Sequence, residues 1–218
     1  DISADRNDSM WVVLQGRHHG NKDYENAVNH YSKEGHVLAK FQCNGKFRIY
    51  GIAADKISDK IILTIKQYSG NSCTERPCAE AVWFSPTHTT CNMSRFRSTE
   101  EGHLPQSVTV DKKGNIFIAD VVNHRVLKYD KNGVYLSSFG SRGGGAGNLL
   151  YPSGICVDSL GRVIVADSWN RRVEMFTAEG DHVRTVAYIH DPEHVAAGGE
   201  GQLVVSHEDH FVTIFPKY

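Results

Sequence analysis

Two short runs in this chain place a carboxylate, an amide and a guanidinium at the same spacing. They comprise Asp120, Asn123 and Arg125, and then Asp167, Asn170 and Arg172. A carboxylate near an arginine could act in acid–base catalysis. The same set occurs twice in register, however, and an active site is rarely duplicated in that way. We therefore expect a structural role, in which the Asn caps a turn and the Asp accepts hydrogen bonds from Arg or backbone N–H groups.

The twelve histidines raise the question of a metal site. Zinc needs at least three protein ligands that are oriented by further hydrogen bonds. No cluster recurs at ligand spacing, and the enlarged loops are not rich in histidine. The sequence also lacks the short motifs of serine hydrolases, phosphate-binding loops and zinc proteases. We expect no metal, no cofactor and no catalytic residue, although the candidate ligands are His103, His124, His190, His194, His207 and His210.

Cations and aromatic side chains occur together in the segments that we expect to form loops. The cations have no acidic residue immediately beside them in the sequence, and they are Lys46, Arg48, Arg95, Arg97, Arg142 and Arg171. Tyr151 and Trp169 lie in the same kind of segment. Aromatic rings that stack on bases, beside cations that hold phosphates, are typical of single-stranded RNA binding. The alternative is that Tyr151 packs internally and the arginines are ordinary solvated side chains.

Composition sets the limits for these interpretations. The chain has 218 residues, 40% of them apolar, and a formal net charge of −1, so no global attraction to nucleic acid is expected. No apolar run approaches the ~20 residues of a membrane span, and no signal peptide opens the chain. The cysteine count is odd, which predicts reduced thiols in a cytoplasmic protein, at Cys43, Cys73, Cys78, Cys91 and Cys156. The chain resembles an excised C-terminal domain.

An internal repeat supplies the elements that position these residues. Residues 104–140 and 151–187 align without a gap, and the pairs Pro105 and Pro152, and Asp111 and Asp158, coincide. Weaker copies flank this pair, including one with an enlarged central loop and a last one that lacks its outer strand. We therefore expect one domain, residues 1–218, with units at about 1–48, 49–103, 104–150, 151–191 and 192–218.

Each unit predicts four short strands, for which residues 107–110, 116–119, 125–129 and 135–139 are the clearest example. One such sheet cannot bury both of its faces alone. Radial stacking of successive sheets buries them and leaves only short edges. The sequence therefore predicts an all-β fold, a closed β-propeller of four-stranded antiparallel blades, with its connecting loops gathered on one rim. The glycine-rich segment 141–147 is expected to be a flexible loop between blades.

The runs ADVVNHRVLKYDKNG and ADSWNRRVEMFTAEG resemble the NHL repeat. The resemblance is strong over residues 104–187 and weak elsewhere. It extends to the C-terminal NHL domains of tripartite-motif proteins, which implies six blades where about five repeats are visible here. It also implies that residues beside the inter-blade prolines bind RNA. By that resemblance we carry over Gln106 and Leu104 around Pro105, and Tyr151 and Ser153 around Pro152.

Three functions follow as hypotheses. The first is a monomeric, non-catalytic module that binds single-stranded RNA, with U-rich RNA as a guess, for post-transcriptional regulation of mRNA. The second is recruitment of regulatory proteins or of substrates for a ubiquitin ligase whose RING lies upstream, with Trp169, Tyr151, Val121 and Val122 as apolar anchors and Arg171 as a contact. The third is a metal-dependent propeller lyase of the peptide-amidating type, which NHL-like sequences also resemble.

Overall fold

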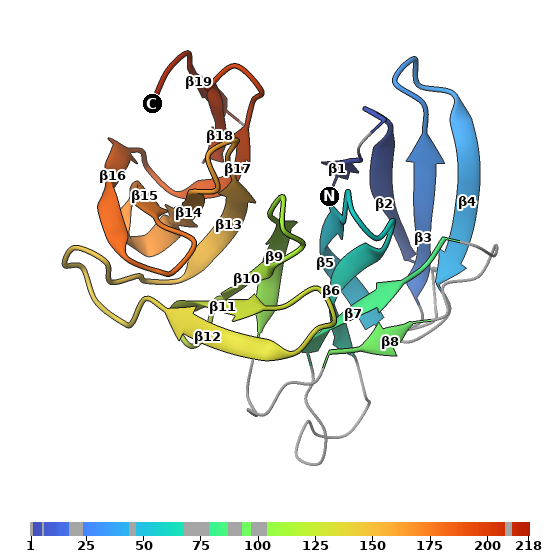
Figure 1. The fold of residues 1–218 in the computed structure, drawn as a ribbon, viewed down its shortest axis with the longest axis horizontal. Helices are drawn as coiled ribbons and strands as arrows, with labels where there is room; N and C mark the ends of the chain where they lie inside the picture. Colours follow the sequence, from blue (N-terminus) through green and yellow to red (C-terminus); the bar gives the residue numbers. More distant parts are fainter. Residues whose placement is uncertain are drawn as a thin grey trace.

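Five antiparallel sheets succeed one another along the chain in the computed structural model (Figure 1). The structure describes residues 2–5, 7–17, 24–43, 47–67, 79–86, 93–96, 104–207 and 211–218. This is an all-β propeller fold of five blades, as the repeat pattern predicted. The described residues contain one 3-10 turn, η1 (Ser168–Asn170). No helix among them is long and apolar enough to cross a membrane.

The blades use the strands in chain order. Blade 1 is β1 (Ile2–Ala4), β2 (Met10–Arg17), β3 (Tyr24–Tyr31) and β4 (Val37–Cys43), and blade 2 is β5 (Phe47–Ala54), β6 (Ile61–Gln67), β7 (Ala79–Phe84) and β8 (Ser94–Arg95). Blade 3 is β9 (Pro105–Val110), β10 (Ile116–Asp120), β11 (Arg125–Tyr129) and β12 (Tyr135–Phe139). Blade 4 is β13 (Pro152–Val157), β14 (Val163–Asp167), β15 (Arg172–Phe176) and β16 (His182–Tyr188). Blade 5 is β17 (Pro192–Ala197), β18 (Leu203–His207) and β19 (Phe211–Phe215).

The second strand of a blade is buried on both faces, which explains its continuous apolar sequence. Every residue of β10 and of β14 is buried. The turn before it is held by an aspartate: Asp111 accepts hydrogen bonds from the backbone N–H of Lys113 and Asn115, both at 2.8 Å. The turn also needs a left-handed residue, and Gly114 supplies it with φ +83°. These local rules repeat in blade 4 and fix the hairpins.

Apolar side chains fill the space between neighbouring blades. One cluster joins Phe117 and Phe139 of blade 3 to Ile155 and Phe176 of blade 4. The innermost strands of blades 4 and 5 approach each other too closely for a side chain to fit between them at Gly154. A Cβ added to Gly154 would lie 2.7 Å from the Cα of His194, so glycine is required there for blades 4 and 5 to meet.

The expectation of a closed ring is wrong for the residues that the structure describes. The inner strands β1, β5, β9, β13 and β17 contact one another in that order. Blades 1 and 5 stand on either side of an opening (Figure 1). Blade 5 has three strands, as the sequence predicted, and the side chains of Val212 and Ile214 on β19 are about 60% exposed (60% and 62%). The ring is open because no further blade among the described residues fills the space between blade 1 and blade 5.

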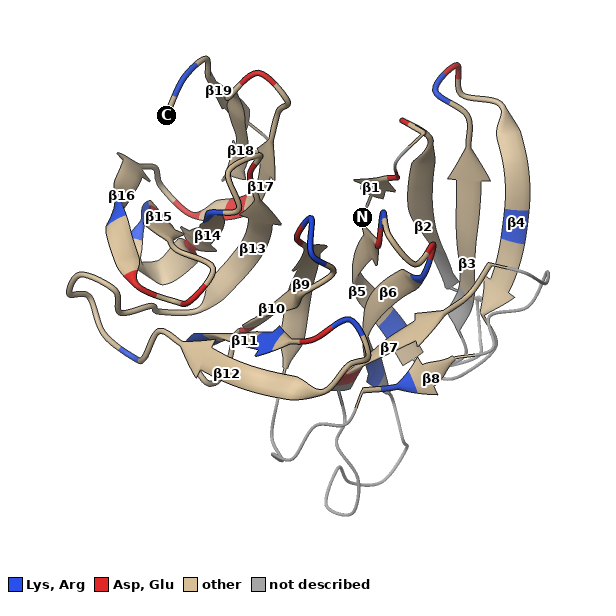
Figure 2. Ribbon diagram, in the orientation of Figure 1, with Lys and Arg blue, Asp and Glu red and all other residues tan. Residues whose placement is uncertain are grey.

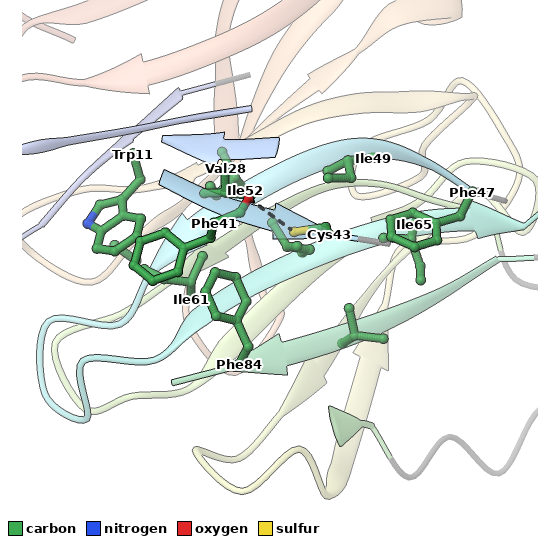
Figure 3. Close-up of a cluster of buried hydrophobic side chains, with 13 residues drawn as sticks. Trp11, Val28, Phe41, Cys43, Phe47, Ile49, Ile52, Ile61, Ile65 and Phe84 are labelled. Carbon is green, nitrogen blue, oxygen red and sulfur yellow. Dashed lines mark hydrogen bonds between the residues drawn. The ribbon is translucent and has the colours of Figure 1, made fainter. Parts of the chain in front are cut away.

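The expectation of reduced thiols is also wrong, because Cys43 is disulfide-bonded. Its partner lies outside the described residues. Cys43 is fully buried in the apolar cluster between blades 1 and 2, next to Phe41 and Phe47 (Figure 3). Cys156 is a free, buried thiol in blade 4, and burial raises its pKa to about 12. Disulfides persist in oxidising environments, so this bond bears on where the protein works.

We expect reduction to destabilise the fold measurably. Loss of a native disulfide costs about 2–4 kcal/mol, which corresponds to a fall in Tm of roughly 4–16 °C for a chain of this size. Thermal melts with and without a phosphine reductant measure this difference. Thiol counting in denaturant is the control: the unreduced chain should label fewer than its five cysteines. Five labelled thiols and an unchanged Tm would contradict the disulfide.

Candidate binding site

A buried carboxylate at the end of the second strand organises the rim of blade 4. Asp167 Oδ1 accepts the backbone N–H of Leu150 at 2.6 Å. Its Oδ2 accepts Asn170 Nδ2 at 2.8 Å and Arg172 Nε at 2.9 Å. One side chain therefore ties together the segment before the blade, the turn after β14 and the start of β15. Burial raises the pKa of Asp167, while these three donors act in the opposite direction.

Blade 3 repeats the arrangement. Asp120 accepts the backbone N–H of Leu104 at 3.1 Å, Asn123 Nδ2 at 2.8 Å and Arg125 Nε at 3.3 Å. The side chains of Asp120 and Asp167 are both completely buried. Such groups support loops and offer no free carboxylate to a substrate. The geometry thus matches the structural interpretation of the repeated motif.

The glycine-rich loop between β12 and β13 is anchored by the same arginine. Arg172 donates from Nη1 to the carbonyl of Gly144 at 3.0 Å, and from Nη2 to those of Gly145 and Asn148, each at 2.9 Å. Asn170 adds a bond to the carbonyl of Gly143 at 2.8 Å. The sequence predicted a flexible loop here. The prediction is corrected because these buried donors hold its backbone carbonyls in place.

Three aromatic rings from two blades form a row on this rim, which we call the aromatic platform: His124, Tyr151 and Trp169. Tyr151 and Trp169 stack, with ring centroids 4.0 Å apart and planes 29° apart. His124 of blade 3 meets the Tyr151 ring edge-on at 4.7 Å. Trp169 is 64% exposed, while His124 is buried. The platform therefore presents one indole to solvent, which stacks on Tyr151, and His124 supports the Tyr151 ring edge-on.

The backbone of Tyr151 is strained in a way that the platform compensates. Its φ of 52° lies in the left-handed region, which is uncommon for an aromatic residue. The N–H of Tyr151 donates to His124 Nδ1 at 3.1 Å, so the imidazole fixes that conformation. Burial, followed by the charge of Arg142, lowers the pKa of His124. Sequence reasoning considered His124 only as a metal ligand and gave no signal for this contact.

The predicted cations do not gather into one basic sector among the described residues (Figure 2). Lys46 and Arg97 lie outside those residues. Arg95 has no acidic residue beside it in the sequence, but in the structure it forms an ion pair with Glu80 at 3.1 Å. The two residues come together because β7 and β8 pair. Arg48 lies on β5 and packs over the ring of Tyr50.

Arg142 and Arg171 are the two predicted cations that lie at the aromatic platform. Both are exposed. Arg142 is close enough to His124 to affect its pKa, and Arg171 follows Trp169 and η1 with a left-handed φ of 55°. The platform thus combines two of the predicted aromatic residues with two of the predicted arginines.

The residues carried over beside the prolines face neighbouring blades. The Ser153 hydroxyl lies 2.6 Å from Ser168 Oγ. It also donates to the backbone carbonyls of Pro192, at 3.0 Å, and Glu193, at 2.8 Å. The backbone carbonyl of Gln106 accepts the Thr64 hydroxyl at 3.2 Å. The Ser153 contacts with Pro192 and Glu193 join the inner strands β13 and β17, and the Gln106 contact joins β9 to the second strand of blade 2, β6. They give Ser153 a tethering role, which the sequence did not predict.

No group of three His, Cys, Asp or Glu side chains could hold a metal ion within the described part of the chain. Two of the candidate ligands, His103 and His210, lie outside it. His182 contacts buried Glu174 at 2.9 Å, and His207 contacts Thr213. His182 and His207 thus take part in local hydrogen bonding.

Comparison with known proteins agrees with this architecture. Residues 103–129 and 149–176 match the model of the NHL repeat, so blades 3 and 4 contain NHL repeats. A comparison with curated protein sequences gives no match. A chain in a crystal structure of a nidogen/laminin complex has a TM-score of 0.70 at 16% identity, over 95% of this chain and 74% of that one.

Two further solved structures show the same fold. One is a protein of unknown function from Bacteroides thetaiotaomicron, with a TM-score of 0.71 at 12% identity over 98% of this chain and 57% of that one. The other is virginiamycin B lyase from Staphylococcus aureus, with a TM-score of 0.61 at 12% identity over 99% of this chain and 68% of that one. At these identities the likeness concerns the fold alone.

We expect Arg172→Lys to destabilise the protein more than Arg125→Lys, the matched change in blade 3. Arg172 is the more buried side chain (8% against 19% exposed). Lysine keeps the charge but cannot bond Asp167 and the three loop carbonyls at once, so buried acceptors are left unpaired at a cost of about 1–3 kcal/mol. Chemical denaturation measures both variants. Amide exchange should also accelerate at residues 143–148 in Arg172→Lys, and equal stability of the two variants would contradict this ranking.

Proposed function

We propose that this propeller is a non-catalytic module that binds a protein partner through the aromatic platform. The observation that carries the proposal is Trp169, an exposed indole held rigidly by stacking on Tyr151. A large aromatic side chain costs energy when it is left in water. It contributes most to binding when its orientation is fixed beforehand, because little entropy is lost on association.

The surroundings of the platform support a protein partner. Val122 and Tyr188 are exposed apolar residues on the same rim, at the turn after β10 and the end of β16. Arg142 and Arg171 add cations beside them. Trp, Tyr and Arg are the residue types that dominate binding energy in protein interfaces. The nidogen of the similar structure is in complex with laminin, which supports the same class of function for this fold.

Single-stranded RNA is the second candidate, favoured by the exposed Trp169 indole and by two exposed arginines, Arg142 and Arg171, on the same rim. Three observations weigh against it. The remaining described cations are dispersed, Ser153 is engaged between blades, and the net charge is −1. The Cys43 disulfide also favours an oxidising compartment over the cytoplasm, where mRNA regulation takes place. The same disulfide weighs against a ubiquitin-ligase substrate as the partner, because ubiquitin ligation takes place in a reducing compartment.

Trp169→Ala is expected to weaken partner binding by about 30-fold or more, as for a hot-spot residue of ~2 kcal/mol. Leu160→Ala is the matched control, because Leu160 is 75% exposed in the β13–β14 turn at the other end of blade 4. Nuclease-treated cell extract and conditioned medium are passed over each immobilised variant. Proteins retained by the wild type and by Leu160→Ala, and lost with Trp169→Ala, support the proposal. Identical retention by all three contradicts it.

A separate measurement decides between the two candidates. Fluorescence anisotropy with short single-stranded RNAs, including oligouridine, is recorded at low and at moderate salt. We expect no binding that depends on Trp169. Binding that falls steeply with salt and is lost in Trp169→Ala would replace the protein-binding proposal with RNA binding.

A further inference from the structure

His124 stands where the aromatic platform joins two blades. It lies in the turn after β10 of blade 3, and Tyr151 precedes β13 of blade 4. The imidazole makes two contacts with Tyr151: it meets the ring at 4.7 Å, and its Nδ1 accepts the backbone N–H at 3.1 Å. Tyr151 in turn carries Trp169 on its ring. Any change at Nδ1 is therefore transmitted to the exposed indole through one residue.

The hydrogen bond at Nδ1 requires the neutral imidazole. An acceptor nitrogen must be unprotonated, so the proton of the neutral ring resides on Nε2. Protonation would place an N–H donor at Nδ1 against the N–H donor of Tyr151. Two donors 3.1 Å apart repel each other, and the left-handed backbone of Tyr151 (φ 52°) would lose the contact that holds it.

The charged groups around His124 determine whether its imidazole is neutral or protonated. Burial and then Arg142 lower the pKa of His124, whereas Asp120 and Asp167 raise it. Each of these carboxylates already accepts hydrogen bonds from an arginine, Asp120 from Arg125 and Asp167 from Arg172. Their attraction for an imidazolium is reduced accordingly. The imidazole is thus neutral at neutral pH and becomes charged only in acidic solution.

We propose that His124 is a positioning residue that holds the aromatic platform in its binding geometry while neutral and releases Tyr151 and Trp169 when protonated. This inference rests on the proposed function of the platform as a binding surface. The partner is held at neutral pH and released in an acidic compartment. The arrangement has no counterpart in blade 4, where Arg171 occupies the matching position of the turn.

The direction of the stability change follows from the same shift. The folded-state pKa lies below that of an unfolded histidine, about 6.5. Below that pH the unfolded chain binds more protons than the folded one at this site, so the stability contributed by His124 declines as the pH falls. Release of the platform therefore has its midpoint below about pH 6.5.

The test follows the platform without any partner. Backbone and indole N–H signals are recorded by NMR from about pH 7.5 to about pH 4.5, and the Trp169 indole is assigned by comparison with Trp169→Phe. We expect the Tyr151 amide and the Trp169 indole to shift together, with one midpoint below about 6.5 that matches the His124 ring signals. His124→Asn is the conservative variant. Asparagine tolerates the left-handed backbone of position 124 (φ 56°) but does not titrate in this range.

In His124→Asn the coupled shift should disappear while the fold is retained, as judged by the remaining amide signals. The inference is overturned if Tyr151 and Trp169 do not respond in the wild type, or respond identically in His124→Asn. Should His124→Asn unfold, the comparison of midpoints in the wild type alone decides. Partner affinity is measured separately and should fall about tenfold or more in acid. Loss of binding in Trp169→Ala without any pH response keeps the proposed function and rejects the switch.

Discussion

The rim of this propeller depends on one buried interaction, the carboxylate that ends the second strand of a blade. Asp120 and Asp167 each accept a backbone N–H from the segment just before the first strand, an amide from the turn after the second strand and a guanidinium from the start of the third. A buried carboxylate without such donors would be costly. Since the donors belong to three separate segments, satisfying the charge fixes the loops relative to the sheet and to the preceding blade. The residues of the aromatic platform lie in the turns and loops that these hydrogen bonds hold in place.

The proposed binding residues lie where the rim has an irregular backbone. Tyr151 is held in a left-handed conformation between a histidine of blade 3 and a tryptophan of its own blade. Strain of this kind persists where surrounding contacts over-determine the structure. The result is an indole that is exposed and yet pre-positioned. The hydrogen bonds described for the repeated carboxylates, in contrast, are all internal. These carboxylates therefore support the rim, while the exposed indole can meet a partner.

The features that were predicted correctly from the sequence recur in successive blades, whereas the features that were missed occur only once. Strands and turns followed from alternation and from Asp111, Gly114 and their counterparts, because local hydrogen bonds dictate them. The internal role of Asp167 followed from duplication of its motif. The contact of His124 with Tyr151 could not be inferred, since it joins two blades and depends on a strained backbone. The pairing of Arg95 with Glu80, the Cys43 disulfide and the opening between blades 1 and 5 likewise depend on how distant segments meet in space.

If the proposed function is correct, a partner meets this protein at the platform rim between blades 3 and 4. Amide hydrogen exchange of the protein, alone and bound to a captured partner, tests it most directly. We expect added protection at residues 121–124, 140–151 and 168–171, with no change in the opposite turns at 111–115 and 158–162. Protection that is confined to those opposite turns, or to β19 of blade 5, would contradict it.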